Sequence, residues 1–457
     1  MRKLFGTDGV RGVANREPMT PQTVMRLGFA AGRQLRTAAR PHDLVSCVVG
    51  RDTRLSGEML ESALAAGLAS AGVQVMRAGI IPTPGVAYLA RYLKMSAGAM
   101  VSASHNPYED NGIKFFTGDG CKLPDEAELA IETMLESLEN GAMGKVQAGL
   151  TGGQVGGGRE LSEGADLYCA YARQTFGGKS LKGMKIVVDC ANGAACVTTP
   201  RVLADLGADV VTIHHAPDGR NINAACGSLH VSQVQRAVIE HKAHVGISHD
   251  GDADRVLMCD ERGQLVDGDF ILGITARHLK MRGELPGDAL VTTVMANLGL
   301  DVAMKKLGVR LLKTQVGDRY VKELMDKEGA VLGGEQSGHI IFARLAPTGD
   351  GLITALEVLK VIVEEGRPFS ELHSFLSTFP QILLNVRVRE KVDLASIPGL
   401  TDAVKQVEAA LGDEGRVVLR YSGTEPVARV MVEGPTEAVV RAHAEAVART
   451  IRDRIGE

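Results

Sequence analysis

The sequence repeats one pattern three times: a short strand, a polar turn, a helix, a glycine and a second strand. The first strands are expected at residues 45–49 (VSCVV), 186–189 (IVVD) and 290–294 (LVTTV). The helices end near Gly72, Gly207 and Gly308, and a second β-rich run follows each of them. Because adjacent parallel strands need a crossover connection, usually a helix, the pattern predicts three α/β domains built around right-handed βαβ units.

The pattern changes after about residue 375. Segments 382–390 (ILLNVRVRE) and 416–434 (RVVLRYSGTEPVARVMVEG) alternate apolar and polar residues, as half-buried antiparallel strands do. A chain of 457 residues is also too long for one core. We therefore expect three similar mixed α/β domains and a smaller α+β domain around one central cleft. The expected domain limits are 1–150, 151–258, 259–372 and 373–457.

The glycine-rich segment 151–160 (TGGQVGGGRE) is interpreted as a flexible linker between the first two domains, with a surface loop as the alternative. The formal net charge of −4 gives no reason to expect nucleic acid or a membrane as a partner. A secretory signal and an apolar run of membrane-spanning length are both missing from the sequence. These features predict a cytoplasmic protein.

The seven cysteines include no C-x-x-C arrangement. We expect reduced, mostly buried thiols rather than a disulfide framework or a thiolate zinc site. The histidine pairs His214/His215 and His241/His244 have no carboxylate or third histidine at a recognised metal spacing. Surface or capping roles are therefore expected for them.

An acidic loop follows the predicted strand in HVGISHDGDADRVLM, residues 244–258. In an extended segment Asp250, Asp252 and Asp254 project to one side, and their mutual repulsion would be relieved by a divalent cation. An all-oxygen ligand set favours magnesium over zinc. An EF-hand is disfavoured because Arg255 stands where that loop requires glycine and the flanks look like strands. A solvated acidic turn remains an alternative.

The segment MVSASHNPY (100–108) places polar residues directly after an apolar run. Pro107 cannot continue a strand and biases Asn106 towards an extended conformation. Ser104 is therefore a candidate for reactive chemistry. An ordinary exit from strand to loop, in which serine and asparagine satisfy backbone groups, is the alternative.

Three further segments carry candidate ligand-binding groups. In RYSGTEP (420–426) and just beyond it, guanidinium, hydroxyl and backbone amide groups suit a phosphate, although a plain β-turn is possible; these residues are Arg420, Ser422, Gly423, Thr424 and Arg429. In GGEQSGH (333–339), Glu335, Ser337 and His339 could bind sugar hydroxyls. In FGTDGVRG (5–12), Asp8 and Arg11 stand among glycines, either near a site or in a tight turn before the first strand.

The ordered set MVSASHNP, DGDADR, GEQSGH and RYSGTEP resembles the motifs of the α-D-phosphohexomutases, and the resemblance extends over essentially the whole chain. The FGTDGVRG opening, the GEQSGH loop and VGDRY (316–320) resemble the branch that acts on glucosamine phosphates. Mutases acting on glucose or mannose phosphates tend to carry histidine where Asp318 stands. Asp318 is thus a marker of the branch.

The resemblance implies conversion of glucosamine 6-phosphate to glucosamine 1-phosphate, which feeds amino-sugar nucleotide and cell-wall precursor synthesis. A phosphoserine would transfer its phosphoryl group to the sugar, and the 1,6-bisphosphate would turn over in the cleft before returning the other phosphate. The implied phosphoserine is Ser104, which with Asp250, Asp252 and Asp254 would hold one Mg²⁺. His105, Lys114, Arg11 and Arg255 would supply positive charge or proton transfer, with Lys114 the first choice for the proton.

The resemblance also implies a role for each domain: the phosphoserine loop, the metal loop, the sugar loop with Glu335, Ser337 and His339, and a distal phosphate loop at 420–429. Priming by glucosamine or glucose 1,6-bisphosphate and a homodimer are further expectations. Alternatives are a phosphoglucomutase or phosphomannomutase with the same mechanism, a magnesium-dependent sugar phosphatase, or a catalytically silent sugar-phosphate-binding protein.

Overall fold

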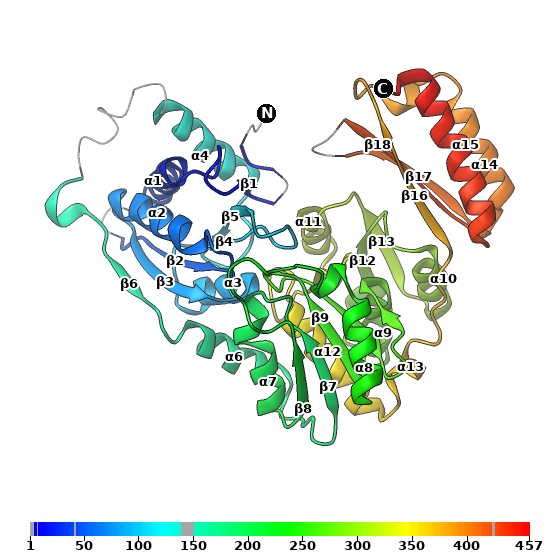
Figure 1. Ribbon diagram of the computed structural model, residues 1–457, viewed down its shortest axis with the longest axis horizontal. Helices are drawn as coiled ribbons and strands as arrows, with labels where there is room; N and C mark the ends of the chain where they lie inside the picture. Colours follow the sequence, from blue (N-terminus) through cyan, green and yellow to red (C-terminus); the bar gives the residue numbers. More distant parts are fainter. Residues whose placement is uncertain (1–3, 7, 41–42, 139–149, 423–425) are drawn as a thin grey trace.

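The computed structural model describes residues 4–6, 8–40, 43–138, 150–422 and 426–457. Four sheets follow one another along the chain, of six, five, four and three strands. The first three combine parallel and antiparallel neighbours, and the fourth is antiparallel. The predicted fold class, three mixed α/β domains and a smaller α+β domain, is confirmed (Figure 1).

The first sheet has the strand order β1-β5-β4-β2-β3-β6. Its strands are β1 (Val10–Val13), β2 (Ser46–Arg51), β3 (Gln74–Ile80), β4 (Ala97–Val101), β5 (Asp110–Thr117) and β6 (Gly158–Glu160). One face packs on helices α1 (Pro21–Ala38), α2 (Gly57–Ser70) and α4 (Asp125–Ser137). The other face packs on α3 (Thr83–Tyr92) and α6 (Gly164–Thr175). The sheet is therefore covered on both sides.

The expected linker belongs to this first sheet. Within segment 151–160, β6 pairs in parallel with β3. A Cβ atom at Gly156 would lie 1.9 Å from the carbonyl oxygen of Val73, so glycine is what allows this segment to pass against the sheet. The interpretation of the segment as a flexible linker is wrong, because its last residues form a strand of the sheet and Gly156 serves close packing.

The second sheet has the order β11-β10-β9-β7-β8. Its elements are β7 (Lys185–Asp189), α7 (Thr199–Asp205), β8 (Asp209–Ile213), α8 (Ser232–His241), β9 (Val245–His249), β10 (Val256–Asp260) and β11 (Leu265–Val266). The third has the order β13-β12-β14-β15. Its elements are α9 (Gly268–Met281), β12 (Ala289–Thr293), α10 (Leu298–Leu307), β13 (Arg310–Thr314), α11 (Asp318–Glu328), β14 (Leu332–Gly334), β15 (Ile340–Phe342), α12 (Gly351–Glu365) and α13 (Phe369–Leu372).

The three sequence repeats correspond to β2-α2-β3, β7-α7-β8 and β12-α10-β13, and the two strands of each are parallel neighbours. One apolar core runs through all three units, from Val48 and Val86 through Tyr168 and Ile247 to Leu356. The predicted repeat is thus real, and its copies share a continuous interior.

The fourth unit contains β16 (Gln381–Arg387), α14 (Leu400–Leu411), β17 (Arg416–Tyr421), β18 (Val427–Glu433) and α15 (Glu437–Ile455). Its sheet, in the order β16-β18-β17, packs on the two helices around a core of its own. Short 3-10 turns complete the chain: η2 (Gly152–Gln154), η3 (Ala194–Val197), η4 (Gly227–Leu229), η5 (Pro286–Asp288), η6 (Leu394–Ser396) and η7 (Gly412–Glu414). Among the helices in the described ranges, none is both long and apolar enough to cross a bilayer.

Candidate active site

Ser104 lies in the loop between β4 and β5, and its backbone has a φ of 52°. This left-handed conformation is uncommon outside glycine and concentrates at functional sites. The hydroxyl of Ser104 donates a hydrogen bond of 2.6 Å to Asp250 Oδ2, and its backbone N–H donates to Ser102 Oγ at 3.0 Å. The fold therefore aims the serine at the acidic loop of the second unit.

Arg54 anchors the serine loop from beneath. Its guanidinium donates to the carbonyl oxygens of Ser104 and Asn106 at 2.8 and 2.9 Å. Its Nε lies 2.8 Å from Asp52 Oδ2, which also accepts a 2.6 Å bond from Ser102 Oγ. Burial raises the pKa of Asp52 even beside Arg54. Asp52 and Arg54 directly follow β2. Residues at the carboxyl end of β2 therefore hold the serine loop, which follows the neighbouring strand β4.

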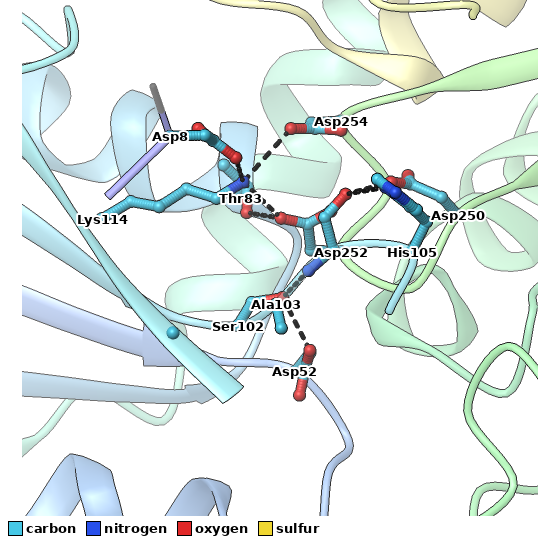
Figure 2. Close-up of polar contacts among 12 residues, drawn as sticks. Asp8, Asp52, Thr83, Ser102, Ala103, His105, Lys114, Asp250, Asp252 and Asp254 are labelled. Carbon is cyan, nitrogen blue, oxygen red and sulfur yellow. Dashed lines mark hydrogen bonds and ion pairs between the residues drawn. The ribbon is translucent and has the colours of Figure 1, made fainter. Parts of the chain in front are cut away.

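The acidic loop between β9 and β10 brings Asp250, Asp252 and Asp254 together, with one carboxylate oxygen from each lying within 4.8 Å of the others. All three side chains are buried. A Cβ atom at Gly251 would lie 2.6 Å from the carbonyl oxygen of Ser104, so glycine permits the two loops to touch. The bond between Ser104 and Asp250 brings the serine loop to the triad, and Figure 2 shows the three aspartates near Ala103 and His105 of that loop.

The triad fits a divalent cation. Within the described chain, the Oδ1 atoms of Asp252 and Asp254 are buried and have no hydrogen-bond partner. Burial raises the pKa of Asp250 well above its usual value, and the charges of Asp254 and Asp252 raise it further. Unpaired buried carboxylate oxygens are costly, and a hard cation satisfies them.

Lys114, on β5, faces the triad from the first unit. Its Nζ lies 2.9 Å from Asp252 Oδ2, 3.4 Å from Asp254 Oδ2 and 3.1 Å from Asp8 Oδ2. Figure 2 shows the ammonium group among these carboxylates. Burial opposes its charge, but Asp252, Asp8 and Asp254 together raise the pKa of Lys114 well above its usual value. Thr83 Oγ1 adds a 2.6 Å bond to Asp252 Oδ2.

His105, Arg255 and Arg11 surround the serine. His105 Nδ1 lies 3.5 Å from Ser104 Oγ and 3.3 Å from a terminal nitrogen of Arg255. Burial, together with the charges of Arg255 and Arg11, lowers the pKa of His105 to about 4. Arg11 donates to the carbonyl oxygen of Ala103 at 3.4 Å. Two of the predicted cationic groups, Arg11 and Arg255, thus lie close to the serine loop, and together with burial they keep His105 neutral.

A cavity of ≈ 640 Å³ opens beside these loops. Its lining combines the first unit with loops of the second and third: Asp8, Arg11, His105, Arg255, Asp318, Glu335 and His339. Ser104 itself is only 1% exposed. The three residues predicted to bind sugar hydroxyls differ in position: Glu335 and His339 line this cavity, whereas Ser337 is exposed.

Glu335 and His339 are fixed by the backbone around them. Glu335 Oε1 accepts a 3.1 Å bond from the amide of Gly317. His339 Nε2 accepts a 3.1 Å bond from the amide of Gly349, which leaves the proton on Nδ1, facing Asp254 Oδ2 at 3.7 Å. The sugar loop is thereby connected to the acidic loop.

Asp318, predicted to mark the glucosamine branch, lies at the start of α11 and lines the cavity. It forms an ion pair with Lys122 of the first unit and lies 3.5 Å from His339 Nε2. Lys122 also bonds to Asp8 Oδ1 at 2.5 Å. Asp318 therefore links the first and third units across the cavity.

Two arginines stand opposite each other in the fourth unit. Arg420 of β17 and Arg429 of β18 are paired in the strand register, and the Nε atoms of both are buried with no hydrogen-bond partner in the described residues. Burial, and then the charge of Arg429, lowers the pKa of Arg420. Like charges directly opposite are destabilising, so this pair is arranged for an anion.

Ser422 and Lys391 complete the described part of this candidate anion site. Ser422 Oγ accepts a 3.5 Å bond from Arg429, and Lys391 Nζ donates to the carbonyl oxygen of Ser422 at 2.7 Å. The predicted phosphate-binding residues Gly423 and Thr424 lie outside the described residues. Among the cationic groups here, sequence reasoning missed Lys391, which stands far from the RYSGTEP segment.

Comparison with known proteins identifies the family. Models of four domains of phosphoglucomutase/phosphomannomutase match in order: α/β/α domain I over residues 2–142, α/β/α domain II over 166–263, α/β/α domain III over 267–379 and the C-terminal domain over 383–450. The chain belongs to the phosphoglucomutase/phosphomannomutase family. Within this family, two similar relatives are named phosphoglucosamine mutase. The one from Pelobacter propionicus is 48% identical, with 100% of each chain covered.

The other, from Carboxydothermus hydrogenoformans, is 51% identical, with 96% of this chain and 98% of the relative covered. Solved structures of the phosphoglucomutase/phosphomannomutase family share the fold. A family protein from Burkholderia thailandensis has a TM-score of 0.80 at 23% identity, with 100% of both chains covered. The N-acetylphosphoglucosamine mutase of Aspergillus fumigatus, solved with GlcNAc-6P and magnesium, has a TM-score of 0.68 at 20% identity, covering 99% of this chain and 96% of that one.

Proposed function

We propose that this chain is a phosphoglucosamine mutase that interconverts glucosamine 6-phosphate and glucosamine 1-phosphate. The observation that carries the proposal is the 2.6 Å contact between Ser104 Oγ and Asp250 at the acidic triad. It places a strained, buried serine at a candidate cation site, as a transferable phosphoryl group requires. The full-length relatives named phosphoglucosamine mutase support the choice of sugar.

In the proposed reaction, the sugar O1 attacks the phosphorus of phosphorylated Ser104. The new P–O1 bond forms as the bond to the serine oxygen breaks, and the proton of O1–H passes to a base. Lys114 and His105 are the proposed proton-transfer groups. His105, with its pKa lowered to about 4, is neutral and can accept the proton, whereas Lys114 must first lose its own proton because nearby carboxylates raise its pKa. The resulting 1,6-bisphosphate turns over, so that its phosphate at O6 returns to Ser104 and glucosamine 1-phosphate leaves.

Mg²⁺ is the proposed cation, one per chain, held by Asp250, Asp252 and Asp254 with the phosphate on Ser104. When bound, such an ion would neutralise charge on the transferring group and orient it. Arg11 and Arg255 would add positive charge on the other side of the serine loop. Priming by glucosamine or glucose 1,6-bisphosphate is part of the proposal, as is a homodimer.

To bind the substrate in both orientations, the enzyme needs two separate binding sites, one for the sugar hydroxyls and one for the phosphate that is not reacting. Glu335 and His339 line the cavity and are proposed to bind sugar hydroxyls, with exposed Ser337 beside them. Arg420, Ser422 and Arg429, with Gly423 and Thr424, are proposed to hold the phosphate that is not reacting. The four predicted domains would thus each supply one loop to a single cleft.

The test is a comparison of kcat/KM for glucosamine, glucose and mannose 6-phosphates, using enzyme primed with the matching bisphosphate and supplied with magnesium. A strong preference for glucosamine phosphate is expected. A preference for glucose or mannose phosphate would contradict the proposed sugar but retain the mutase. Release of inorganic phosphate as the main product would instead identify a sugar phosphatase.

A further inference from the structure

A second cluster of metal-ligating side chains lies in the second unit, apart from the acidic triad. It consists of Asp189, His214 and Cys226, whose ligand atoms lie within 4.8 Å of one another. Asp189 and Cys226 are buried, and His214 is partly exposed. The three residues stand far apart in the sequence, so no local spacing reveals them.

The sheet and one turn create this cluster. Asp189 ends β7 and is paired in register with Ile213, the last residue of β8, so His214 follows directly beside it. Asp189 Oδ2 accepts a 2.9 Å bond from the amide of Gly227, which brings the preceding Cys226 to the same place. Asp189 Oδ1 accepts a second 2.9 Å bond, from the amide of Ala191. Backbone donors thus fix the carboxylate before any ligand arrives.

The cluster leaves donor atoms unsatisfied. His214 Nδ1 lies 3.2 Å from Asp189 Oδ1, yet it is buried and makes no well-directed hydrogen bond to the described part of the chain. Cys226 Sγ receives a long contact, 3.9 Å, from Asn192 Nδ2 and a backbone hydrogen bond from Asn223. The contact from Asn192 is weak, because hydrogen bonds fade with distance.

The backbone around the cluster is also strained. Four non-glycine residues have left-handed φ values between 47° and 53°: Ala191, Asn192, His214 and Ala225. A left-handed backbone at a non-glycine residue costs conformational free energy and persists only where the surrounding contacts hold it in place. Such residues are concentrated at functional sites. A ligand that ties β7, β8 and the turn at Cys226 together would supply that constraint.

We propose that Asp189, His214 and Cys226 bind a zinc ion, with solvent in the fourth position. One carboxylate, one imidazole and one thiolate form a ligand set that suits zinc and does not suit magnesium. Cys226 binds as the thiolate, and its proton passes to solvent. The His214 side chain is 31% exposed, which gives the ion a route from water.

This zinc site acts on the serine loop through one residue. Asn223, three positions before Cys226, donates from Nδ2 to the carbonyl oxygens of Ser104 and Asn106 at 2.9 and 3.0 Å. An ion bound to Cys226 would hold the turn that carries Asn223 and Cys226. It would thereby hold Asn223 in position to donate its hydrogen bonds to the serine loop. The role of the ion is structural, and the acidic triad remains a separate cation site.

The test measures zinc bound to the purified full chain. The protein is stripped with a chelator, given zinc in a large excess of magnesium, freed of unbound metal by gel filtration and analysed by mass spectrometry of the elements. Wild type should retain about one zinc per chain. Cys226→Ser and His214→Gln should each weaken zinc binding by roughly 10–100-fold or more, since loss of even an outer partner of a ligand costs that much.

Two controls separate this site from others. Cys121→Ser alters a partly exposed thiol of the first unit, and Asp252→Asn alters the triad; both should keep zinc. With cobalt in place of zinc, wild type should show a thiolate-to-cobalt absorption band that Cys226→Ser lacks. If one ligand variant fails to fold, the other ligand variant and the cobalt spectrum of wild type still show whether the metal binds at this cluster.

Three outcomes would overturn the proposal. The first is wild type that retains no zinc, and the second is zinc retention unchanged in both Cys226→Ser and His214→Gln. The third is loss of zinc in Asp252→Asn, which would place the ion in the triad. Because substrate turnover is not the readout, failure here leaves the proposed mutase activity untouched.

Discussion

Arg420 and Arg429 face each other across the β17–β18 ladder, with the buried Nε of each unpaired among the described residues. Replacing either with alanine should remove charge-assisted bonds to the distal phosphate, worth about 1.5–3 kcal/mol each. KM for glucosamine 6-phosphate should therefore rise roughly 10–100-fold. Steady-state kinetics checks this, with Arg449→Ala on the exposed side of α15 as the control. An unaltered KM would move the phosphate site elsewhere.

Ser104→Ala should abolish isomerisation, because the hydroxyl that carries the phosphoryl group is gone. We expect a fall in kcat on the order of 10³-fold or more, with the circular dichroism spectrum unchanged. Phosphate incorporation from labelled bisphosphate should also disappear. Exposed Ser162 provides the matched control in Ser162→Ala. Near-normal turnover in Ser104→Ala would end its assignment as the nucleophile.

Asp252→Asn removes one anionic oxygen from the triad. The magnesium concentration needed for half-maximal activity should rise roughly tenfold or more. A magnesium titration of initial rates measures this, alongside Asp326→Asn on the exposed face of α11. If the magnesium dependence of Asp252→Asn equals that of wild type, the triad is only structural.

Arg54→Met should destabilise the fold by about 3–5 kcal/mol, because Asp52 is left as an uncompensated buried charge. The side chains of both residues are 0% exposed. Adding Asp52→Asn to Arg54→Met should recover part of that loss. Urea unfolding of the two single variants and the double variant measures the coupling. Purely additive losses would show that the pair is not energetically linked.

Asp350 gives the stability a defined pH dependence. Burial raises the pKa of this carboxyl to about 6 from its usual 3.8, so the folded state holds the proton more tightly than the unfolded chain. Its contribution to stability is therefore full below about pH 4 and declines as pH rises through 6. Asp350→Asn removes this decline while keeping an oxygen for the bonds from Tyr168 and Ile353.

Relative to wild type, Asp350→Asn should gain about 2 kcal/mol between pH 4 and pH 7. Chemical unfolding at several pH values checks this, and exposed Asp413→Asn should run parallel to wild type. If the free energy of unfolding of Asp350→Asn also changed with pH in parallel with wild type, the pKa of Asp350 would not be raised in the folded state.

The architecture could be predicted because strands and helices leave local signals in the sequence: a regular spacing of apolar residues and a glycine where a helix ends. The three strand-helix-glycine-strand units and the alternating strands after residue 375 were found by such signals, and Ser104 does meet the acidic triad. The roles of these residues stay predictions. Segment 151–160 was misjudged because glycine signals both flexibility and close packing, and only the position of Val73 distinguishes them.

Residues that reach the site only through contacts with distant parts of the chain could not be predicted from the sequence. Arg54, Thr83 and Lys122 reach the site through contacts with residues 50 or more positions away or in another unit. One signal was available for Arg54, since it follows the carboxyl end of a predicted strand, where ligands of α/β sheets gather. The same signal was available for Asp189, which ends a predicted strand, and for His214, which follows the next β-rich run. Nothing local indicated Cys226, which the bond from Gly227 to Asp189 brings to this place.

The continuous core of the first three units divides the molecule mechanically into two bodies. The fourth unit keeps its own apolar interior and meets the third through polar contacts, such as those of Arg416 with Ala296 and of Glu433 with Leu298. The serine loop, the acidic loop and the sugar loop all belong to the larger body. In the proposed reaction, the intermediate that turns around must leave both the distal phosphate site and the groups around Ser104. Movement of the fourth unit would open the distal phosphate site while the serine loop, the acidic loop and the sugar loop keep their alignment with one another.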